Sequence, residues 1–499
     1  MKKINKLLFV GLLAVLMGCN DAIDIRQPGR LDAANAFRSV EDLQLGLLNV
    51  YDQWDLTPEI ALASNFTDEV VPGFDTGGQG VALYGFVMNA ATPAAADFWV
   101  RNYRSNNRAT ILIEAAASIT PDASEQDQYN NILAQAHAIR AYANLELLTY
   151  FSPDPTDDST LAAPVIDFVP GLGIQPSRDT TGDLWAYIDS DLNLAASLST
   201  EQSNATFISR DAITAMRARA ALTRRDYTTA ATLASQLLAS YPIANTTQYQ
   251  LMFLDADNTE IIFKLERTVN DNYDGQGSTN NDVGAFAGGW AGARFAFVDA
   301  TLTGSPYFEM DRGLFNLMDP ADVRFTVNVA PSSVINPNYD TDPDPVNTDI
   351  LVIQKYPGSE GQPLMNDLKV FRSAEMLLIL AEARAAQNDL AGAAALIDQL
   401  RDARFGSDQA APSYGSQADA FAGILDERRI ELSFEGHRYK DLKRLGVAAN
   451  RGIDRDMTDC TNQGNACTLA ASDFRFTLPI PIVEINGNPG IASQQNPGY

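Results

Sequence analysis

Two distant segments of the chain share one pattern of alanine and leucine residues. The matching positions are Asp226, Ala230, Ala231, Leu233 and Leu237 in the first segment, and Asp389, Ala393, Ala394, Leu396 and Leu400 in the second. Each segment follows another helical stretch, 211–223 or 374–387, so each is expected to be the second arm of a helical hairpin. Small alanines at fixed offsets let two helices approach closely, which is typical of tetratricopeptide repeats. The pattern predicts a mostly α-helical scaffold.

The rest of the chain alternates between helical periodicity and long irregular stretches. Apolar residues recur at helical spacing over 35–54, 102–117 and 129–150. Two stretches at about 64–97 and 270–366, in which Gly, Asn and Asp recur, lack this period and predict long inserted loops. The aromatic content of the second stretch favours order over disorder. We therefore predict a single domain over 19–499, in which helical hairpins form a superhelical scaffold with irregular inserted loops.

The N-terminus has the layout of a cleaved secretion signal. Lys2, Lys3 and Lys6 precede an apolar run over 7–17, and Gly18 and Cys19 follow it. The run is too short to cross a bilayer, and its end resembles the lipobox of bacterial lipoproteins, in which the cysteine is acylated after cleavage. An ordinary signal peptide with an incidental cysteine is the alternative. We predict that 1–18 is a lipoprotein signal peptide and that lipid on Cys19 tethers the mature protein to a membrane.

The mature chain is strongly acidic. The sequence contains 63 acidic and 36 basic residues, and removal of 1–18 takes away three lysines, which leaves a net charge of −30. A field of this sign disfavours binding to nucleic acid and to anionic membrane surfaces. It argues mildly against a highly anionic polysaccharide, although a local basic patch can overrule the global charge. A salt-adapted surface has the same composition.

The cysteine count predicts one disulfide. Three cysteines are present, and Cys460 and Cys467 remain once Cys19 is assigned to lipid. An even remainder in an oxidising compartment indicates a disulfide that closes the short loop between them. A metal site is the alternative, but it needs two further ligands, and the histidines of the sequence are His137 and His437.

An acidic loop has aspartates at alternate positions, Asp340, Asp342 and Asp344, with Asn338, Asn347 and Asp349 nearby. Such a set of oxygens can bind calcium. The loop lacks the turn glycine of an EF-hand, where Pro345 stands, and no glutamate occupies the closing position. We therefore predict a solvated acidic loop, with neither a metal nor a cofactor.

The sequence shows no recognisable catalytic constellation. Two histidines leave little choice of a base for a nucleophilic triad, and neither lies in a known motif. No glycine-rich phosphate loop follows an apolar strand. A glycosidase needs two facing carboxylates, which 63 acids can always supply. We predict a protein that is not an enzyme, with a glycoside hydrolase or lyase as the alternative.

Three specific motifs lie in the C-terminal part of the chain. They are a helix that runs from Arg372-Ser-Ala-Glu375 to Ala381-Glu382-Ala383, the chain end Asn496-Pro497-Gly498-Tyr499, and a charged segment with Glu427, Arg428, Arg429, Glu431, Glu435, Arg438 and Asp441. With these motifs the chain resembles the SusD/RagB family of nutrient-uptake lipoproteins of Bacteroidetes, and the resemblance covers 19–499. The charged residues mix signs at helical spacing, so we interpret them as a salt-bridged helix face rather than a catalytic cluster.

The resemblance implies four tetratricopeptide-like helix pairs, with the ligand bound by the inserted loops on the opposite side. It implies a glycan, either an oligo- or a polysaccharide, as ligand, and a SusC-like TonB-dependent transporter as partner, over which the lipoprotein acts as a hinged lid. The acidic residues after Cys19 match part of the signal that sends such lipoproteins to the cell exterior, so an outer-membrane location facing outwards is expected. A peptide-binding uptake lipoprotein is a further alternative, because some relatives import oligopeptides.

Sugar recognition requires flat aromatic faces and polar groups that pair with hydroxyls. Core packing is expected for the three tryptophans in helical stretches, which are Trp54, Trp99 and Trp185. Trp290 differs because glycines surround it, and a stretch so rich in glycine does not form a stable helix. The predicted ligand-binding residues are Trp290, Tyr273 and Asp274 and, as weaker candidates, Phe74 and Tyr84.

Overall fold

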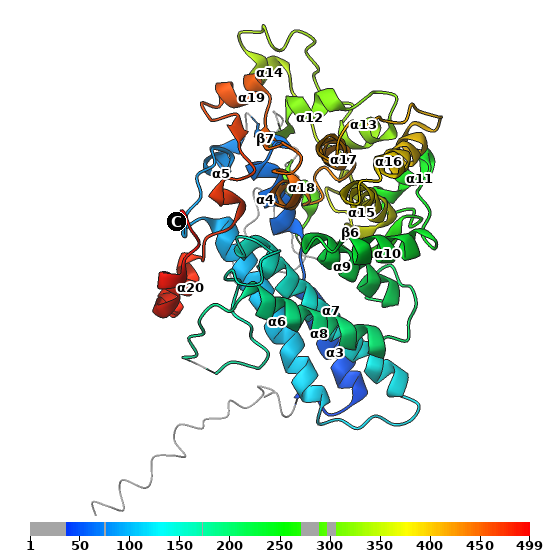
Figure 1. Cartoon of the computed structure of the whole chain (residues 1–499), viewed down its shortest axis with the longest axis vertical. Coiled ribbons are helices and arrows are strands. Elements are labelled where there is room, and N and C mark those ends of the chain that lie inside the picture. The colour runs from blue at the N-terminus through cyan, green and yellow to red at the C-terminus, as the bar shows by residue number, and fades with distance from the viewer. Residues whose placement is uncertain (1–35, 74–75, 172, 271–288, 297–305) are drawn as a thin grey trace, which may run out of the picture.

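The computed structural model describes residues 36–73, 76–171, 173–270, 289–296 and 306–499 (Figure 1). The helices of the first half are α3 Val40–Asp52, α4 Thr57–Phe66, α5 Val81–Tyr84, α6 Pro93–Ala116, α7 Gln126–Phe151, α8 Thr181–Leu198, α9 Arg210–Thr223, α10 Tyr227–Leu238 and α11 Thr246–Met252. Those of the second half are η2 Ala291–Arg294, α12 Arg312–Leu317, α13 Val323–Asn328, α14 Pro345–Thr348, α15 Ser373–Ala386, α16 Leu390–Phe405, α17 Gln417–Glu431, α18 Arg438–Leu445, α19 Met457–Asn462, η3 Phe474–Phe476, α20 Ile482–Gly487 and η4 Pro489–Gln494. None of the described helices is long and apolar enough to span a membrane.

The strands of the described residues form two-stranded antiparallel pairs. The pairs are β1 Val70–Pro72 with β3 Phe308–Met310, β2 Ile261–Leu265 with β6 Leu368–Arg372, β4 Gly358–Ser359 with β5 Gln362–Pro363, and β7 Ile453–Asp454 with β8 Thr468–Leu469. With so little sheet, the helices carry the core, and the fold class predicted from the sequence is confirmed.

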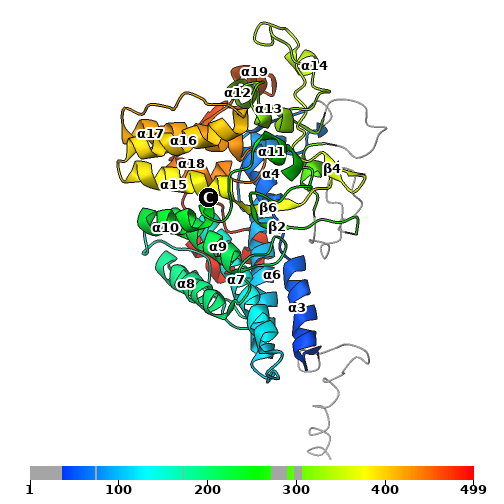
Figure 2. The same cartoon turned by 90° about the vertical axis from the view of Figure 1, so that its right-hand side faces the viewer.

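The repeated segments form the second helices of two hairpins, α9–α10 and α15–α16. Each begins at its aspartate, because the carboxylate of Asp226 accepts a hydrogen bond from the backbone N–H of Thr229, and that of Asp389 accepts one from Gly392. The helices of each pair pack together, and α10 also packs on α15. Figure 2 shows the resulting stack, in which α8, α10, α15 and α16 follow one another upwards. The insert between the hairpins is therefore looped out of a continuous scaffold.

α7 is buried far more completely than its sequence pattern indicates. The periodicity over 129–150 predicts one apolar face, but every residue from 134 to 151 is buried, because α3, α6, α8 and α9 all pack against this helix. Its polar residues have partners inside the core. The guanidinium of Arg140 donates to both carboxylate oxygens of Asp191, at 2.8 and 2.7 Å, and the Nδ1 atom of His137 lies 2.7 Å from the same carboxylate. His137 is thus a packed core residue.

Two strand pairs attach the inserted segments to the scaffold. In the first pair, β2 and β6 place Ile261 opposite Arg372. This pairing brings together the two ends of the 270–366 insert. β1 and β3 place Val70 opposite Met310, so that the 64–97 and 270–366 segments meet. Both segments contain more regular structure than the sequence indicates, since they include α5, α12 to α14 and β3 to β5, and α6 already begins at Pro93. In Figure 2, α14 and β4 lie on the side away from the helix stack.

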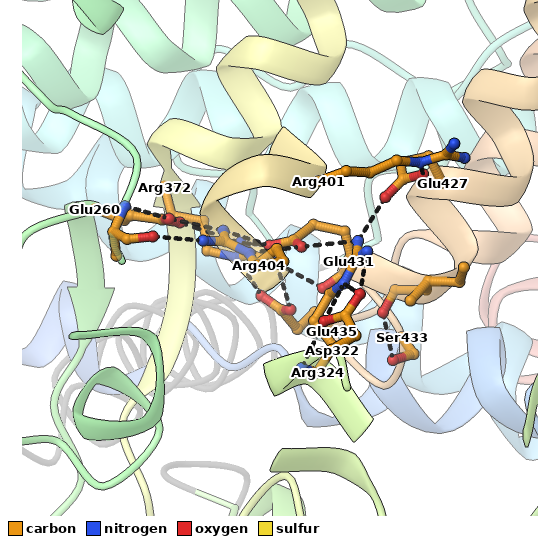
Figure 3. Close-up of polar contacts among 12 residues, drawn as sticks. Glu260, Asp322, Arg324, Arg372, Arg401, Arg404, Glu427, Glu431, Ser433 and Glu435 are labelled. Atoms are coloured by element: carbon orange, nitrogen blue, oxygen red, sulfur yellow. Dashed lines mark hydrogen bonds and ion pairs between the residues drawn. The ribbon is translucent and has the colours of Figure 1, made fainter. Parts of the chain in front are cut away.

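Three of the charged signature residues, Glu427, Glu431 and Glu435, join a buried ion-pair network (Figure 3). The other four form buried ion pairs outside it, Arg428 with Asp441, Arg429 with Asp311, and Arg438 with Asp68. Glu431 lies 2.5 Å from a guanidinium nitrogen of Arg372, 2.9 Å from one of Arg404 and 3.3 Å from one of Arg324. These four side chains are at most 2% exposed. The predicted salt bridges are present, but their partners come mainly from other elements rather than from neighbouring turns of one helix.

The network is balanced in charge. It joins five cations, Arg324, Lys355, Arg372, Arg401 and Arg404, to five carboxylates, Glu260, Asp322, Glu427, Glu431 and Glu435. Burial by itself would raise the pKa of Glu431, but the charges of Arg404 and Arg372 outweigh it and hold that pKa well below its ordinary value. Glu431 therefore stays ionised near neutral pH, and the ion pairs of the network join α16 and α17 to β6 and to Glu260, just before β2.

Candidate functional site

The corner between α3 and α4 faces a small cavity of about 30 Å³. Gln53 to Leu56 form one wall, and side chains of α6 and α7, including Arg101, Asn102 and Glu146, complete the lining. η2, in the 270–366 insert, packs against α4 beside this corner. The scaffold and the insert thus converge here. We call the set Asp55, Thr57, Glu59, Arg101, Glu146, Arg267 and Arg294 the corner site.

Asp55 is the electrostatic centre of the corner site. Its side chain is fully buried and lies 2.9 Å from a guanidinium nitrogen of Arg101 and 3.4 Å from one of Arg267. It also accepts hydrogen bonds from the backbone N–H and the hydroxyl of Thr57, at 3.0 and 2.7 Å. Burial acts to raise the pKa of Asp55, but the two arginines and Thr57 outweigh it, so the pKa is lowered. Asp55 is therefore ionised and holds two arginines in fixed positions.

The segment 289–294 is seated directly on this corner. Arg294 donates a hydrogen bond to the Thr57 hydroxyl at 3.1 Å, and Arg267 donates one to the carbonyl of Gly289 at 3.2 Å. A Cβ atom at Gly289 would come within 2.6 Å of the Thr57 hydroxyl, so glycine is required for this close approach. The corner site thereby sets the position of Trp290.

Two carboxyl groups, Glu59 and Glu146, lie side by side at the inner wall. Burial, followed by the charge of Glu59, raises the pKa of Glu146 to about 8. Glu59 forms an ion pair with Lys440 and accepts a long hydrogen bond from the hydroxyl of Tyr150. Among the described residues, Glu146 forms no ion pair. Glu146 therefore holds a proton at neutral pH, whereas the charge of Glu59 is compensated.

Burial limits the chemistry of Glu59 and Glu146 in the corner site. Both residues are at most 5% exposed, and the Oε2 atom of Glu146 has no hydrogen-bond partner among the described residues. A glycosidase needs two carboxyl groups that flank the bond to be cleaved, with room for the sugar or a water between them. In this conformation neither carboxyl group is exposed enough to flank such a bond. The corner site offers fixed hydrogen-bonding groups, which suits binding.

The sequence of the chain is similar to those of known proteins. The SusD family model matches residues 259–499. A SusD-like protein from Formosa agariphila is 26% identical, and the alignment covers 100% of both chains. This chain is thus similar to the SusD family in its C-terminal half and to a SusD-like protein over its whole length.

Solved structures share its fold. A SusD superfamily protein from Bacteroides thetaiotaomicron matches with a TM-score of 0.73 and 22% identity, over 92% of this chain and 100% of the other. Surface glycan-binding protein A from Bacteroides fluxus matches with a TM-score of 0.70 and 20% identity, over 93% of this chain and 100% of the other. The family and the helical fold predicted from the sequence motifs are therefore confirmed.

The aromatic residues predicted to bind ligand differ in their surroundings in this SusD-like protein. Tyr84 is fully buried, with the guanidinium of Arg455 3.7 Å from its ring centre, so it is a core residue and its prediction as a stacking surface is wrong. Trp290 is 6% exposed and packs with Ala293 and Met365. The core placement of the helical tryptophans is confirmed for Trp54, Trp99 and Trp185. Three further candidates lie outside the described residues, namely Phe74, Tyr273 and Asp274.

The structure places Cys460 and Cys467 in a disulfide, with Cα atoms 5.2 Å apart. Cys19 and the predicted signal peptide lie outside the described residues. In the acidic loop, Asp342 accepts hydrogen bonds from Asn336 and Thr348 of the same loop, and Asp349 pairs with Arg312. The described residues contain no group of three or more histidine, cysteine or acidic side chains that could hold a metal ion.

Sequence reasoning missed the corner site. Asp55 lies two residues before Thr57, the first residue of α4, and Pro58 follows Thr57. An acid shortly before a helix and a proline in its first turn typically mark a helix start. That signal would have located α4 and drawn attention to Asp55. The partners Arg101 and Arg267 come from α6 and from the segment after β2, and nothing in their local sequence links them to Asp55.

Proposed function

We propose that this SusD-like protein binds a glycan at the corner site and passes it to a TonB-dependent transporter of the SusC type. The main support is the setting of the site in a fold shared with a surface glycan-binding protein. A fixed carboxylate and arginines lie next to amide and hydroxyl groups of Gln53, Asn102 and Ser105. Groups of this kind pair with sugar hydroxyls.

Trp290 is the residue that we propose to stack on the glycan. In the described conformation its indole is covered, so stacking requires the segment 289–294 to move away from the corner. The hydrogen bonds from Arg294 to Thr57 and from Arg267 to Gly289 are among the contacts that a ligand would have to replace for the segment to move. Tyr273 and Asp274, in the same insert, are proposed to join it.

The charge distribution favours a neutral or weakly charged glycan. Among the described residues, Asp55 is the one carboxylate that faces both Arg101 and Arg267, so the corner keeps only a small local positive excess. The net charge of the mature chain, −30 when 1–18 is removed, repels polyanions at long range.

An affinity panel tests the proposed ligand class. Neutral oligosaccharides, acidic oligosaccharides and peptides would be titrated against the mature protein by calorimetry. We expect binding to a neutral glycan. Tight binding to peptides alone would replace the proposal with peptide uptake, and new reducing ends or unsaturated products during incubation would replace it with a hydrolase or lyase.

The anchor and the partner need separate tests. We propose that Cys19 carries lipid and that the protein faces outwards from the outer membrane. Intact mass of the membrane-extracted protein should show loss of 1–18 and a gain of acyl mass, and a Cys19→Ala variant should lose membrane retention. A pull-down in mild detergent from the native host should recover a large transporter, whose repeated absence would contradict the proposed delivery step.

A further inference from the structure

A second groove lies on the flank of the scaffold, apart from the corner site. It is open, with a volume of about 400 Å³, and runs between α3, α7 and the segment 199–209 that joins α8 to α9. Gln44, Gln128, Asn131, Gln135, Glu201 and Phe207 line it. We call it the amide groove. α3 and α7 lie side by side in the lower half of Figures 1 and 2.

The lining has an unusual composition for a chain with so many charges. Four of the six side chains are amides, one is a carboxylate and one is a phenyl ring, and no lysine or arginine is among them. Each planar amide offers both donors and an acceptor, a combination that matches adjacent hydroxyl groups. The single charge, on Glu201, disfavours an anionic ligand and does not require a cationic one. The chemistry fits an uncharged, hydroxyl-rich molecule.

The back of the groove is held rigid by hydrogen bonds. The Gln135 side-chain carbonyl accepts a bond from the hydroxyl of Tyr51 at 2.6 Å, and that hydroxyl accepts one from the backbone N–H of Ile208 at 2.7 Å. Asn131 binds Thr200 twice, to its hydroxyl and to its backbone N–H, both at 2.7 Å. These bonds fix α7 to the 199–209 segment. A ligand therefore meets a preorganised wall, which lowers the entropy cost of binding.

The front of the groove keeps free hydrogen-bonding groups. Within the described chain, the side-chain amides of Gln44 and Gln128 form no hydrogen bond to protein, and Gln128 is exposed. They face a groove whose other wall is already ordered. Their donors and acceptors are thus available to a ligand in solution.

Phe207 supplies the apolar face that sugar binding needs. Its ring is 36% exposed, and Tyr51 packs against it edge-to-face at 5.5 Å between centroids. The side chain of Asn204 accepts hydrogen bonds from the backbone N–H groups of Thr206 and Phe207, at 3.0 and 2.9 Å, and so fixes the backbone that carries the ring. An anchored, partly open aromatic ring beside free amides is suited to a pyranose ring, which has apolar C–H faces and hydroxyl edges.

We propose that the amide groove is a second carbohydrate site, which binds a neutral oligosaccharide independently of the corner site. Gln44 in the groove and Gln53 at the corner are nine positions apart on and just after α3, which corresponds to about 14 Å along the helix axis and about half a turn around it. The two sites therefore open on different sides of α3, which fits independent binding.

The test uses the mature, full-length protein with 4-fluorophenylalanine placed at position 207. Five neutral probes would be titrated, cellohexaose, xylohexaose, mannohexaose, laminarihexaose and maltohexaose, with polygalacturonate hexamer as the anionic comparison. We expect one neutral probe to shift the ¹⁹F signal. No shift with any of the five, or a larger shift with the anionic hexamer, would overturn the proposal.

Point variants distinguish binding at the amide groove from binding at the corner site. We expect Gln128→Ala to weaken the ¹⁹F titration about tenfold, in line with the loss of one or two hydrogen bonds. Gln126→Ala is the matched control, because Gln126 lies on the same helix and bonds to Asn130 instead of facing the groove. Trp290→Ala should leave the titration unchanged. If instead Trp290→Ala abolishes the shift and Gln128→Ala does not, the signal belongs to the corner site and the second site does not exist.

Discussion

The signature network and the corner site both bury charged groups, but they use them differently. In the network every carboxylate faces at least one cation, and Glu431 faces three arginines. In the corner site, Glu146 has no ion pair among the described residues. Burial and the charge of Glu59 raise its pKa to about 8, so it carries a proton at neutral pH. Burial of charge therefore does not by itself mark a functional site. What distinguishes the two regions is whether the charges are fully compensated, because compensated charges stabilise one structure and an uncompensated group responds to pH and ligands.

The largest expected effect is in the network. Glu431→Gln leaves Arg324, Arg372 and Arg404 without their shared carboxylate, so the free energy of unfolding should fall by about 3–5 kcal/mol. Urea denaturation followed by circular dichroism measures this change. A loss below about 1 kcal/mol would mean that the network is not the stabilising region and that the contrast with the corner site is incorrect.

The pH dependence of Glu146 is the next largest effect. Its pKa is raised from 4.5 to about 8 in the folded protein. The folded state therefore keeps a proton that the unfolded state loses, so this contribution to stability is full below about pH 4.5 and is lost as the pH rises through about 8. Glu146→Gln stays neutral at every pH. It should match the wild type at pH 4 and exceed its stability at pH 9 by roughly 2–4 kcal/mol.

Thermal or urea unfolding at several pH values tests this expectation. Glu360→Gln is the matched control, because Glu360 is exposed and should show no such crossover. A pH profile for Glu146→Gln that runs parallel to the wild type would show that Glu146 is ionised in the fold, and the corner site would then be compensated like the network.

Ligand binding at the corner site is expected to change by a smaller amount. Trp290→Ala should weaken binding of the identified glycan by about 1–3 kcal/mol, or about tenfold to over a hundredfold, if the indole stacks on the sugar. Phe168→Ala is the control, since Phe168 is an exposed aromatic on a different segment. Wild-type affinity in a folded Trp290→Ala protein would make Trp290 a packing residue and leave Tyr273 as the next candidate.

The smallest effect should come from an exposed ion pair. Arg384 and Asp389 lie 3.4 Å apart with side chains 48% and 42% exposed. Arg384→Gln should change the free energy of unfolding by less than about 1 kcal/mol, because water and salt screen the pair. A loss as large as that of Glu431→Gln would show that burial is not the cause of the difference between ion pairs in this protein.

The sequence predicted those features that depend on near neighbours along the chain. The alanine pattern located both hairpins, and the aspartates at their starts cap α10 and α16. The partners of the signature charges were not predictable, because they come from distant positions. Arg438, for example, pairs with Asp68 at 2.8 Å across 370 positions. A local pattern shows that charges alternate, but it carries no information on which distant group compensates each one.

Local sequence patterns predicted even less of the candidate site. The glycine-rich setting of Trp290 marked a segment that does contact the corner site. Its burial, however, depends in part on Met365, a distant residue whose proximity the local pattern does not show. Tyr84 was misjudged because the neighbouring glycine suggested an exposed turn, whereas Arg455 from the C-terminal region covers its ring. Loops in this fold are positioned by distant side chains, so their composition alone does not separate covered aromatics from open ones.

The side chain of Arg455 has a consequence for the order in which the protein folds. It donates hydrogen bonds to the carbonyl groups of Thr67, Tyr84 and Phe66, which lie 371 to 389 positions earlier in the chain. Until this arginine has been synthesised, those buried carbonyls lack their donor, and closing so long a loop makes the final step slow. We therefore expect a chain that stops before Arg455 to be an incompletely folded, protease-sensitive intermediate and not a smaller stable domain.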